Sequence, residues 1–370
     1  MSVVDNAAVP AAGSHRITWA HPPGGFLGLS LLNGLLRILT LGVYHFWGKT
    51  EVRQRIWSAV RIDGEPLEYR GTGGELFKGF LIVFALVLLP LSIVGFLPVL
   101  LWGVSFTSNF AIQAAIFLVI IALGGFGMFR ARRYRLSRTR WRGIRGGLSG
   151  RSTPFAWTYL WTTALIPLTL GWIIPWRAAR LQRALFNETH FGDKAFTFTG
   201  RSGPLYVRYV LVWLSAIILY FAAFTAIFTV YFAGLGGPPP PGGPLPSPSY
   251  AQIAAMIAIG LGALLIFAMI RAWYSSRMFN YFASETKYHG CGFRLTTTVP
   301  SLVWLAATNY LMRALSLGVL SPITEARSMR YIVERLTLEG SVDWPAVGQN
   351  PDALLARGEG LAEAFDVDAF

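Results

Sequence analysis

The sequence predicts an all-α membrane protein with internal repeats, and three observations carry this prediction. The chain of 370 residues has a mean hydropathy of +0.48, with 54% hydrophobic and only 14% charged residues. These values lie outside the range of ordinary soluble domains. Two long blocks, 79–129 and 209–270, contain no Asp, Glu, Lys or Arg. Finally, an apolar run that ends in Leu-Gly and precedes a basic helix occurs three times.

Four long apolar segments are expected to cross the membrane as helices, because each charge-free block has room for two spans of about 20 residues. The segments are 77–102, 109–129, 205–233 and 250–273. Within each pair the connection carries no charge, at 103–108 and at 234–249. The second connection is rich in Pro and Gly, which predicts irregular structure.

Three shorter apolar segments, 26–47, 155–176 and 302–323, are each interrupted near their end. Glycine and proline inside a span release backbone groups that must find other partners. The predicted breaks are Gly42, Gly171, Pro175, Gly318 and Pro322. The second and third copies align at a constant offset, and the first copy aligns around its own Leu-Gly. The pattern indicates an internal duplication.

Five short stretches with strand-like alternation follow basic segments, at 60–71, 139–150, 189–200, 286–297 and 336–344. Asp63-Gly64 and Gly192-Asp193 are dipeptides that favour tight hairpin turns. Isolated two-stranded hairpins are marginally stable in water. We therefore expect these small hairpins to pair or stack into a β layer on one side of the membrane.

Charge predicts which side of the membrane each loop occupies. The basic loops 48–76, 130–153, 177–204 and 274–299 and the C-terminus are expected in the cytosol, and the charge-free connections 103–108 and 234–249 in the periplasm. Four crossings satisfy this arrangement if the three short Leu-Gly segments are re-entrant or interfacial. The alternative is seven full crossings, which would place loop 177–204 outside.

The predicted organisation has five parts. An N-terminal tail (1–25) precedes a first repeat (26–129), a second repeat (130–273), a third repeat (274–344) and an acidic C-terminal tail (345–370).

The run LLNGLLRILTLGVYHFWGKTEVRQRIW, followed by DGEPLEYRGTGGELFKGFLI, resembles the bacterial DUF898 family, the YjgN-like inner membrane proteins. The resemblance extends over about 16–340 and implies a multi-pass protein of the inner membrane. It implies no mechanism, because the family name records an unknown function. The third copy departs from the pattern, since Ile323 stands where the other copies have Trp47 and Trp176.

No catalytic or cofactor-binding motif is recognisable, so we expect a protein that is not an enzyme and that needs no cofactor or metal. The single cysteine, Cys291, excludes a disulfide framework and a CxxC metal site. The bases lie in short loops beside apolar spans, which favours a positive-inside pattern over binding of nucleic acid.

The candidate binding residues lie in the short segments and in the basic helices behind them. Asn33 with Arg37, and Asn309 with Arg313, share one helical face through their i, i+4 spacing. They predict an anion or headgroup site, although a shallow arginine can also snorkel to the surface. Arginines after the breaks suit lipid phosphates, and two tryptophans suit interfacial anchors. The arginines are Arg53, Arg180, Arg183, Arg327 and Arg330, and the anchors are Trp47 and Trp176.

Two functions remain open on these observations. The first is that of a transporter or channel-like protein for a small or anionic solute or lipid, built on broken helices. The alternative is that of a scaffold or accessory protein that binds anionic phospholipid or a protein partner through its basic cytosolic face.

Overall fold

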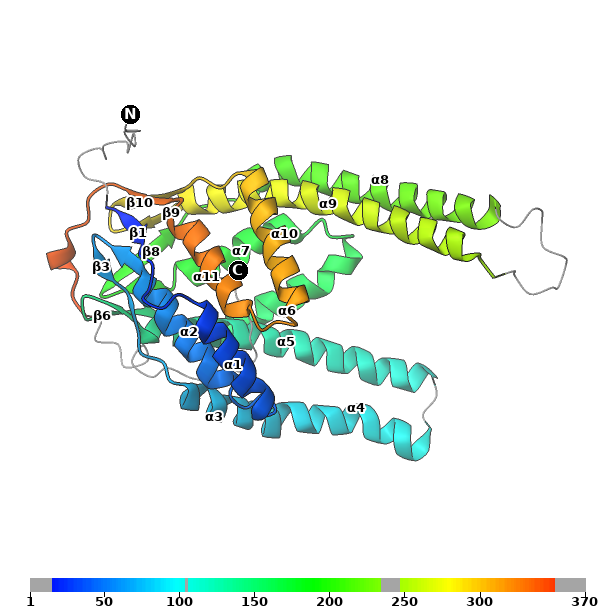
Figure 1. Cartoon of the computed structure of the whole chain (residues 1–370), viewed down its shortest axis with the longest axis horizontal. Coiled ribbons are helices and arrows are strands. Elements are labelled where there is room, and N and C mark those ends of the chain that lie inside the picture. The colour runs from blue at the N-terminus through cyan, green and yellow to red at the C-terminus, as the bar shows by residue number, and fades with distance from the viewer. Residues whose placement is uncertain (1–14, 104–105, 234–246, 350–370) are drawn as a thin grey trace. The chain divides into compact units, whose positions relative to one another are not determined.

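The computed structural model describes residues 15–103, 106–233 and 247–349, and its elements are labelled in Figure 1. The chain divides into two compact units. Unit 1 comprises Met1–Gly200, Asn280–Thr296 and Leu305–Phe370, and unit 2 comprises Arg201–Phe279 and Thr297–Trp304. The predicted repeat boundaries after residues 129 and 273 fall inside continuous helices, and the repeats themselves stay a prediction.

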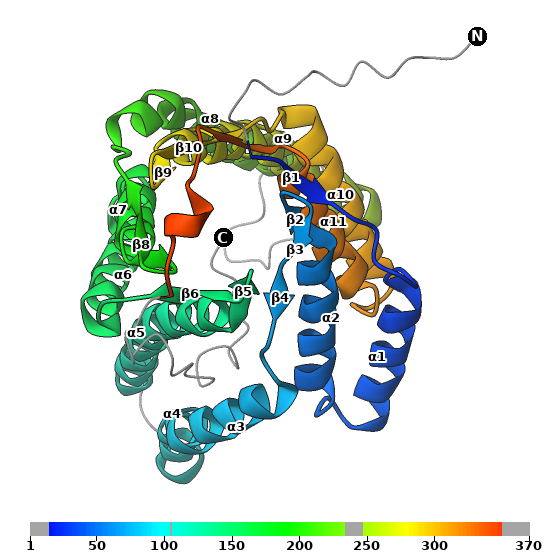
Figure 2. The same ribbon diagram turned by 90° about the vertical axis from the view of Figure 1, so that its left-hand side faces the viewer.

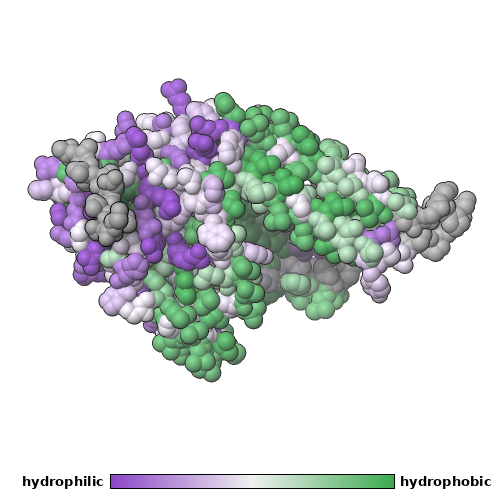
Figure 3. Space-filling view, turned by 45° about the horizontal axis from the view of Figure 1, so that its top comes forward, coloured by the Kyte–Doolittle hydropathy of each residue, from purple (hydrophilic) through white to green (hydrophobic). Residues whose placement is uncertain are grey.

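Four helices are long and apolar enough to cross a membrane, namely Gly73–Pro98, Asn109–Arg138, Gly203–Ala233 and Tyr250–Ser284. The first consists of α3 (Gly73–Val83), a π-helical turn (Phe84–Leu88) and the start of α4 (Leu89–Trp102), and the others belong to α5 (Phe106–Arg138), α8 (Gly203–Ala233) and α9 (Tyr250–Ser284). Figure 3 shows hydrophobic residues in green over the long helices and hydrophilic residues in purple over the strands. The four predicted spans are therefore confirmed as helices.

Two of these helices extend further than the apolar segments predicted. Helix α5 continues through the first arginines of the basic loop 130–153, and α9 continues into loop 274–299 as far as Ser284. Arginine has a high helix propensity, so a change from apolar to basic composition does not end a helix.

Each of the three short Leu-Gly segments is divided between two helices that meet at a tight turn. The pairs are α1 (Leu27–Leu39) with α2 (His45–Ala59), α6 (Ser152–Leu168) with α7 (Ile174–Phe186), and α10 (Val299–Leu315) with α11 (Ser321–Val333). The 13 residues of α1 and the 17 of α6 and α10 rise only about 20 to 26 Å. The hydrocarbon core is about 30 Å thick, so these helices are shorter than a typical span, and their re-entrant placement stays a prediction.

The eleven strands of the described chain all belong to unit 1 and pair antiparallel in two sheets. Eight strands, β4 to β11, form one sheet in sequence order, and β1, β2 and β3 form the other. The strands are β1 (Ile17–Trp19), β2 (Val60–Ile62), β3 (Glu65–Pro66), β4 (Glu68–Tyr69), β5 (Thr139–Trp141), β6 (Ile144–Leu148), β7 (Thr189–Phe191), β8 (Lys194–Phe198), β9 (Thr286–Tyr288), β10 (Cys291–Leu295) and β11 (Leu336–Glu339).

Four of the five predicted hairpins and the association of all five stretches into a β layer are confirmed, whereas the fifth stretch, 336–344, has only one strand, β11, which pairs with β10. Neighbouring hairpins join through strands that are distant in sequence. Tyr69 pairs with Thr139, Phe198 with Thr286, and Leu295 with Leu336. The description as all-α is thus too narrow, because strands from all five stretches join the eight-stranded sheet, and the β2–β3 hairpin pairs with β1 in a second sheet. Strand β1 was not predicted, and it pairs with β2.

The hairpin turns have the backbone conformations that two-residue connections require. Asp63 and Gly64 both have positive φ, at 49° and 87°, as in a type I′ turn. The β5–β6 and β9–β10 turns repeat this pattern. In the β7–β8 turn only Gly192, the first central residue, has positive φ, at 61°, as in a type II′ turn. Both types match the twist of the flanking strands, which explains the short connections.

Residues 342–349, which we call the closing segment, follow β11 and run towards β6 (Figure 2). Trp344 lies among aromatic rings from three hairpins. Its ring centroid is 4.6 Å from that of Trp141, 6.4 Å from Phe191 and 6.3 Å from Tyr288. Each of these three residues ends the first strand of its hairpin. Equivalent positions of three β-hairpins therefore supply the aromatic rings around Trp344, which we call its socket.

Hydrogen bonds from backbone groups to backbone and side-chain partners hold both ends of the closing segment. The Val342 N–H donates to His15 Nε2 at 2.9 Å, just before β1. The Asp193 N–H donates to the Gly348 carbonyl at 2.9 Å, and the Gly348 N–H donates to Asp193 Oδ1 at 3.0 Å. The closing segment, which follows β11, is thus bonded to the residue before β1 at one end and to the β7–β8 turn at the other.

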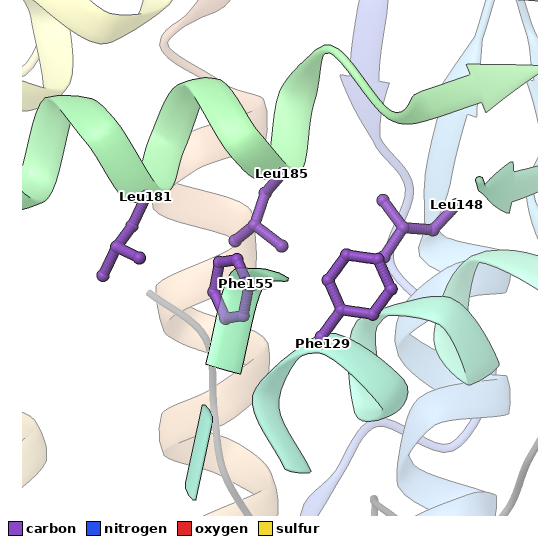
Figure 4. Packing of buried hydrophobic residues seen from close by; sticks show 5 residues of the cluster. All are labelled: Phe129, Leu148, Phe155, Leu181 and Leu185. Carbon is purple, nitrogen blue, oxygen red and sulfur yellow. The ribbon is translucent and has the colours of Figure 1, made fainter. Parts of the chain in front are cut away.

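A hydrophobic core lies where α5, β6, α6 and α7 meet, as shown in Figure 4. It consists of Phe129, Leu148, Phe155, Leu181 and Leu185, all of which are buried. The rings of Phe129 and Phe155 have centroids 5.5 Å apart. This core fixes the second helix pair against the base of a long helix and against the sheet.

In unit 2, α8 and the part of α9 up to Phe279 are joined by polar and aromatic contacts. The Gln252 amide donates to the Val230 carbonyl at 3.0 Å. Near the other end, the Tyr209 and Tyr274 rings meet edge to face at 5.2 Å.

Several predicted segments lie partly outside the described residues. These are the N-terminal tail (described from residue 15), the connections 103–108 and 234–249 (except 103, 106–108 and 247–249), and the acidic tail (described as far as 349).

Candidate functional site

The three helix pairs share one turn, which is built from the same hydrogen bonds in each copy. In the first pair the Gly42 N–H donates to the Arg37 carbonyl at 2.7 Å, and the Leu41 N–H donates to the Ile38 carbonyl at 3.2 Å. These two bonds define the Schellman motif, which satisfies the last carbonyls of a helix. The same bonds join Gly171 to Ile166 and Leu170 to Pro167, and Gly318 to Arg313 and Leu317 to Ala314.

A hydroxyl side chain in each turn prepares the second helix. The Thr40 Oγ1 atom accepts from the Tyr44 N–H at 2.9 Å, and Ser316 Oγ accepts from the Leu320 N–H at 3.1 Å. Thr169 makes the corresponding bond to the N–H of Ile173 at 3.4 Å. These bonds satisfy donors near the start of the second helix, which would otherwise lack partners. Sequence reasoning overlooked these hydroxyls, although each stands two residues before the glycine of its Leu-Gly.

The predicted breaks divide into two kinds. Gly42, Gly171 and Gly318 lie in the turns, with φ of 92°, 82° and 83°. Pro175 and Pro322 occupy the first turn of the helices that follow, where a missing N–H is tolerated and the fixed φ suits the helix. The glycines therefore form the turns, and the prolines start the helices that follow these turns.

The turns present large apolar side chains at the surface. The side chains of Leu41 and Leu317 are 95% and 94% exposed, and that of Leu170 is 74% exposed. Their neighbours Leu39, Leu168 and Leu315 are also well exposed. In Figure 1 the α1–α2 turn lies at the end of its hairpin that faces away from the strands, on the side towards which α4 and α5 extend.

Asn33 and Asn309 each connect the two helices of one helix pair. The Asn33 amide donates to the Gly48 carbonyl at 3.3 Å, and the Asn309 amide donates to the Thr324 carbonyl at 3.3 Å. Asn309 also donates to Ser328 Oγ at 3.0 Å. In both cases the asparagine stands 15 residues before its carbonyl acceptor in the sequence, so the two bonds are equivalent. This geometry gives the two asparagines a structural role between helices.

The arginines of the same helical faces stand one turn before the exposed leucines. Arg37 is exposed near the C-terminus of α1, where the helix dipole favours a cation. Arg313 is also exposed, and its Nε–H donates to Thr324 Oγ1 at 2.6 Å. The second hairpin has Ile166 at this position. Two of the three turns therefore carry a cation close behind an apolar tip.

The arginines of the second helices are more involved in the protein than predicted. Arg53 is buried, with its guanidinium 6.0 Å from the Tyr69 ring centroid. Arg183 donates to the Gly200 carbonyl at 2.6 Å. Arg327 donates to Thr308 Oγ1 at 2.9 Å. Arg330 forms an ion pair with Glu334. Arg180 is exposed and lies 5.9 Å from the ring of Trp176.

The two predicted anchors pack against neighbouring aromatic rings. Trp47 lies 5.6 Å from Phe77 at the start of the first span, and it is only partly exposed. Trp176 lies 5.4 Å from Trp161 on the partner helix of its hairpin. Both rings therefore stabilise packing between helices, and their role as membrane anchors stays a prediction.

One cluster of Ser, His and Glu has an arrangement unsuited to nucleophilic catalysis. Ser149 Oγ donates to the Glu188 carboxylate at 2.7 Å, whereas the His190 Nδ1 atom is 3.5 Å away. A catalytic triad needs the histidine between the hydroxyl and the carboxylate. Among the described residues no group of three His, Cys, Asp or Glu side chains has metal-binding geometry.

The fold and the site define a class of protein: a mainly helical chain with four helices able to cross a membrane and a small β layer. The chain belongs to the family described as bacterial protein of unknown function (DUF898), whose sequence model matches residues 15–364. It is also similar to the inner membrane protein YjgN of Salmonella typhimurium (strain LT2), with 26% identity over 161 residues. That match covers 44% of this chain and 38% of the relative's length. No solved structure matches the chain.

Proposed function

We propose that this protein is a non-enzymatic scaffold of the bacterial inner membrane that binds anionic phospholipid. In this proposal four helices cross the bilayer, and the three helix pairs enter one leaflet as re-entrant elements. The β layer and the basic loops lie on the cytosolic side, and the connections 103–108 and 234–249 face the periplasm. The inner-membrane name of the relative and the distribution of positive charge support this arrangement.

The observation that carries the proposal is the pairing of exposed arginine with an exposed apolar turn. Arg37 and Arg313 each lie four residues before the leucine of the turn, so an α-helix separates the two positions by about 6 Å along its axis. Interfacial helices bury their apolar faces about 5–10 Å into the boundary between headgroups and acyl chains. A guanidinium at this height meets lipid phosphates, which it binds through paired hydrogen bonds.

Transport of an anionic solute or lipid receives less support from the geometry. In the most apolar part of each candidate span, at most 22% of the residues are buried within the protein. A transport path requires helices that surround it and bury their inner faces. The described spans would need further copies of the chain for that purpose, whereas a scaffold role does not require an enclosed path.

The proposal is tested by replacing the three exposed arginines together, as Arg37→Gln, Arg180→Gln and Arg313→Gln. A basic side chain near an anionic surface contributes about 1 kcal/mol, which salt screens. We expect the ratio of anionic to zwitterionic phospholipid that co-purifies with the protein to fall several-fold. Lipid mass spectrometry of the purified protein at low and high salt measures this ratio.

The matched control is Arg61→Gln, which removes an exposed arginine from β2 in the sheet. It should leave the lipid ratio unchanged. An equal ratio in the triple variant and the unaltered protein, with both folded, would show that these arginines do not select anionic lipid.

A further inference from the structure

Each of the three turns places leucine in a conformation that usually belongs to glycine. Leu41, Leu170 and Leu317 have φ of 50°, 48° and 50°, in the left-handed region. Each is the residue after the helix C-cap in its Schellman motif, where glycine is the usual choice because a Cβ atom is unfavourable there. A branched apolar side chain at this position is strained, and the strain occurs three times.

Packing within the protein does not compensate for this strain. At 95%, 74% and 94% exposure, the three leucines bury little of their surface against other residues. In water such side chains would also be unfavourable, because apolar surface is stabilised only when it leaves water. The benefit of leucine must therefore come from surroundings outside the chain.

Surroundings that suit exposed leucines are the acyl chains of a lipid bilayer. Unit 1 contains two of the candidate spans, and exposed apolar residues occur both in these spans and beside the turns of the helix pairs. Ile38 and Leu39 precede the first turn, and Leu168 and Leu315 precede the others, all well exposed. Each tip is thus a small apolar patch that ends in the strained leucine.

We propose that Leu41, Leu170 and Leu317 are membrane anchors whose side chains enter the hydrocarbon of a single leaflet. This inference rests on the proposed re-entrant hairpins and identifies the residues that hold them in the lipid. The Schellman turn points the leucine outward at the end of the hairpin, where the next backbone groups already have partners. An apolar tip can therefore enter lipid without exposing unsatisfied N–H groups.

The depth of the tips can be measured in reconstituted vesicles that contain anionic and zwitterionic phospholipid. Single cysteines replace the leucines as Leu41→Cys, Leu170→Cys and Leu317→Cys in a Cys291→Ser background, and each carries an environment-sensitive fluorophore. We expect nitroxide groups on the acyl chains to quench these probes several-fold more than aqueous iodide does. The control Arg61→Cys on β2 should show the reverse. Quenching of the tip probes by iodide to the level of the control would overturn the proposal.

A second variant separates anchoring from stability of the turn. The combined change Leu41→Asn, Leu170→Asn and Leu317→Asn keeps a residue that tolerates the left-handed region but removes the apolar group. In detergent it should unfold at the same temperature as the unaltered protein or at a higher one, because asparagine adopts this conformation with less strain. In vesicles, a probe at Val43→Cys in this variant should lose at least half of its quenching by acyl-chain nitroxides. A lower unfolding temperature together with unchanged quenching would show that the leucines serve only the fold.

The two proposals fail in different ways. Inserted tips combined with an unchanged lipid ratio in the arginine variant would leave the anchors in place and reject anionic-lipid selection. Tips exposed to water combined with a lowered lipid ratio would do the opposite.

Discussion

Replacing Trp344 with alanine is expected to open the closing segment and to destabilise unit 1. Large-to-small changes of a well-packed tryptophan cost about 3–5 kcal/mol, and the partly buried position of Trp344 places the expected loss near about 3 kcal/mol. Cys291 reports the opening, because it is fully buried beside Val342 and Val347 in the same cluster. Burial also raises the pKa of this thiol, which slows its reaction with thiol reagents.

The measurement follows the fluorescence of a thiol-reactive dye while the detergent-solubilised protein is heated. In the Trp344→Ala variant, Cys291 should become reactive several degrees earlier than in the unaltered protein. Trp344→Phe should retain most of the stability because it keeps an aromatic ring in the socket. Trp157→Ala, an exposed tryptophan of α6, is the matched control. Equal onset temperatures for Trp344→Ala and Trp157→Ala would contradict the role of the closing segment.

Phe129→Ala is expected to weaken the core that attaches the α6–α7 helix pair to α5 and β6. The side chain is 2% exposed, and removal of a buried phenylalanine costs about 3–5 kcal/mol through lost burial and a residual cavity. The Arg133 guanidinium lies 5.0 Å from the Phe129 ring centroid and donates to the Leu148 carbonyl at 3.0 Å. Loss of the ring therefore also removes support from this link to β6. Unfolding by denaturant in mixed micelles measures the change in free energy.

The control for this variant lies on the same helix. Phe110 is 68% exposed, so Phe110→Ala should change the unfolding free energy by less than about 1 kcal/mol. If Phe129→Ala were as mild as Phe110→Ala, the core would contribute less to stability than its burial indicates.

The long helices and the hairpins could be predicted because their signals are local. Charge-free runs of sufficient length indicate spans, and dipeptides such as Asp63-Gly64 indicate a turn whatever surrounds them. The pairing between hairpins depends on long-range contacts, such as that between Phe198 and Thr286. A sequence pattern does not specify which distant strand becomes the neighbour. For the same reason β1, with three residues, was missed.

The candidate site was predicted by residue type but not by partner. Arg183 has a backbone carbonyl of Gly200 as its acceptor, and carbonyl positions cannot be read from side-chain identities. The leucines in the left-handed region were also missed, because the prediction assigned the unusual backbone conformation to the glycine that follows each of them. The signal was present, since leucine precedes the glycine in all three copies.

Strand order in the large sheet also bears on how the protein is made. From β4 to β11 every strand lies beside its neighbours in the sequence, so each new strand joins the free edge of those already synthesised. Between β4 and β5, and again between β8 and β9, the chain contains long helices that are able to cross a membrane. Until β9 is synthesised, β8 has no partner on that side, and unpaired edges promote association with other chains. We therefore expect the β8 edge to stay unpaired during synthesis until the residues of β9, which follow α8 and α9, have been made.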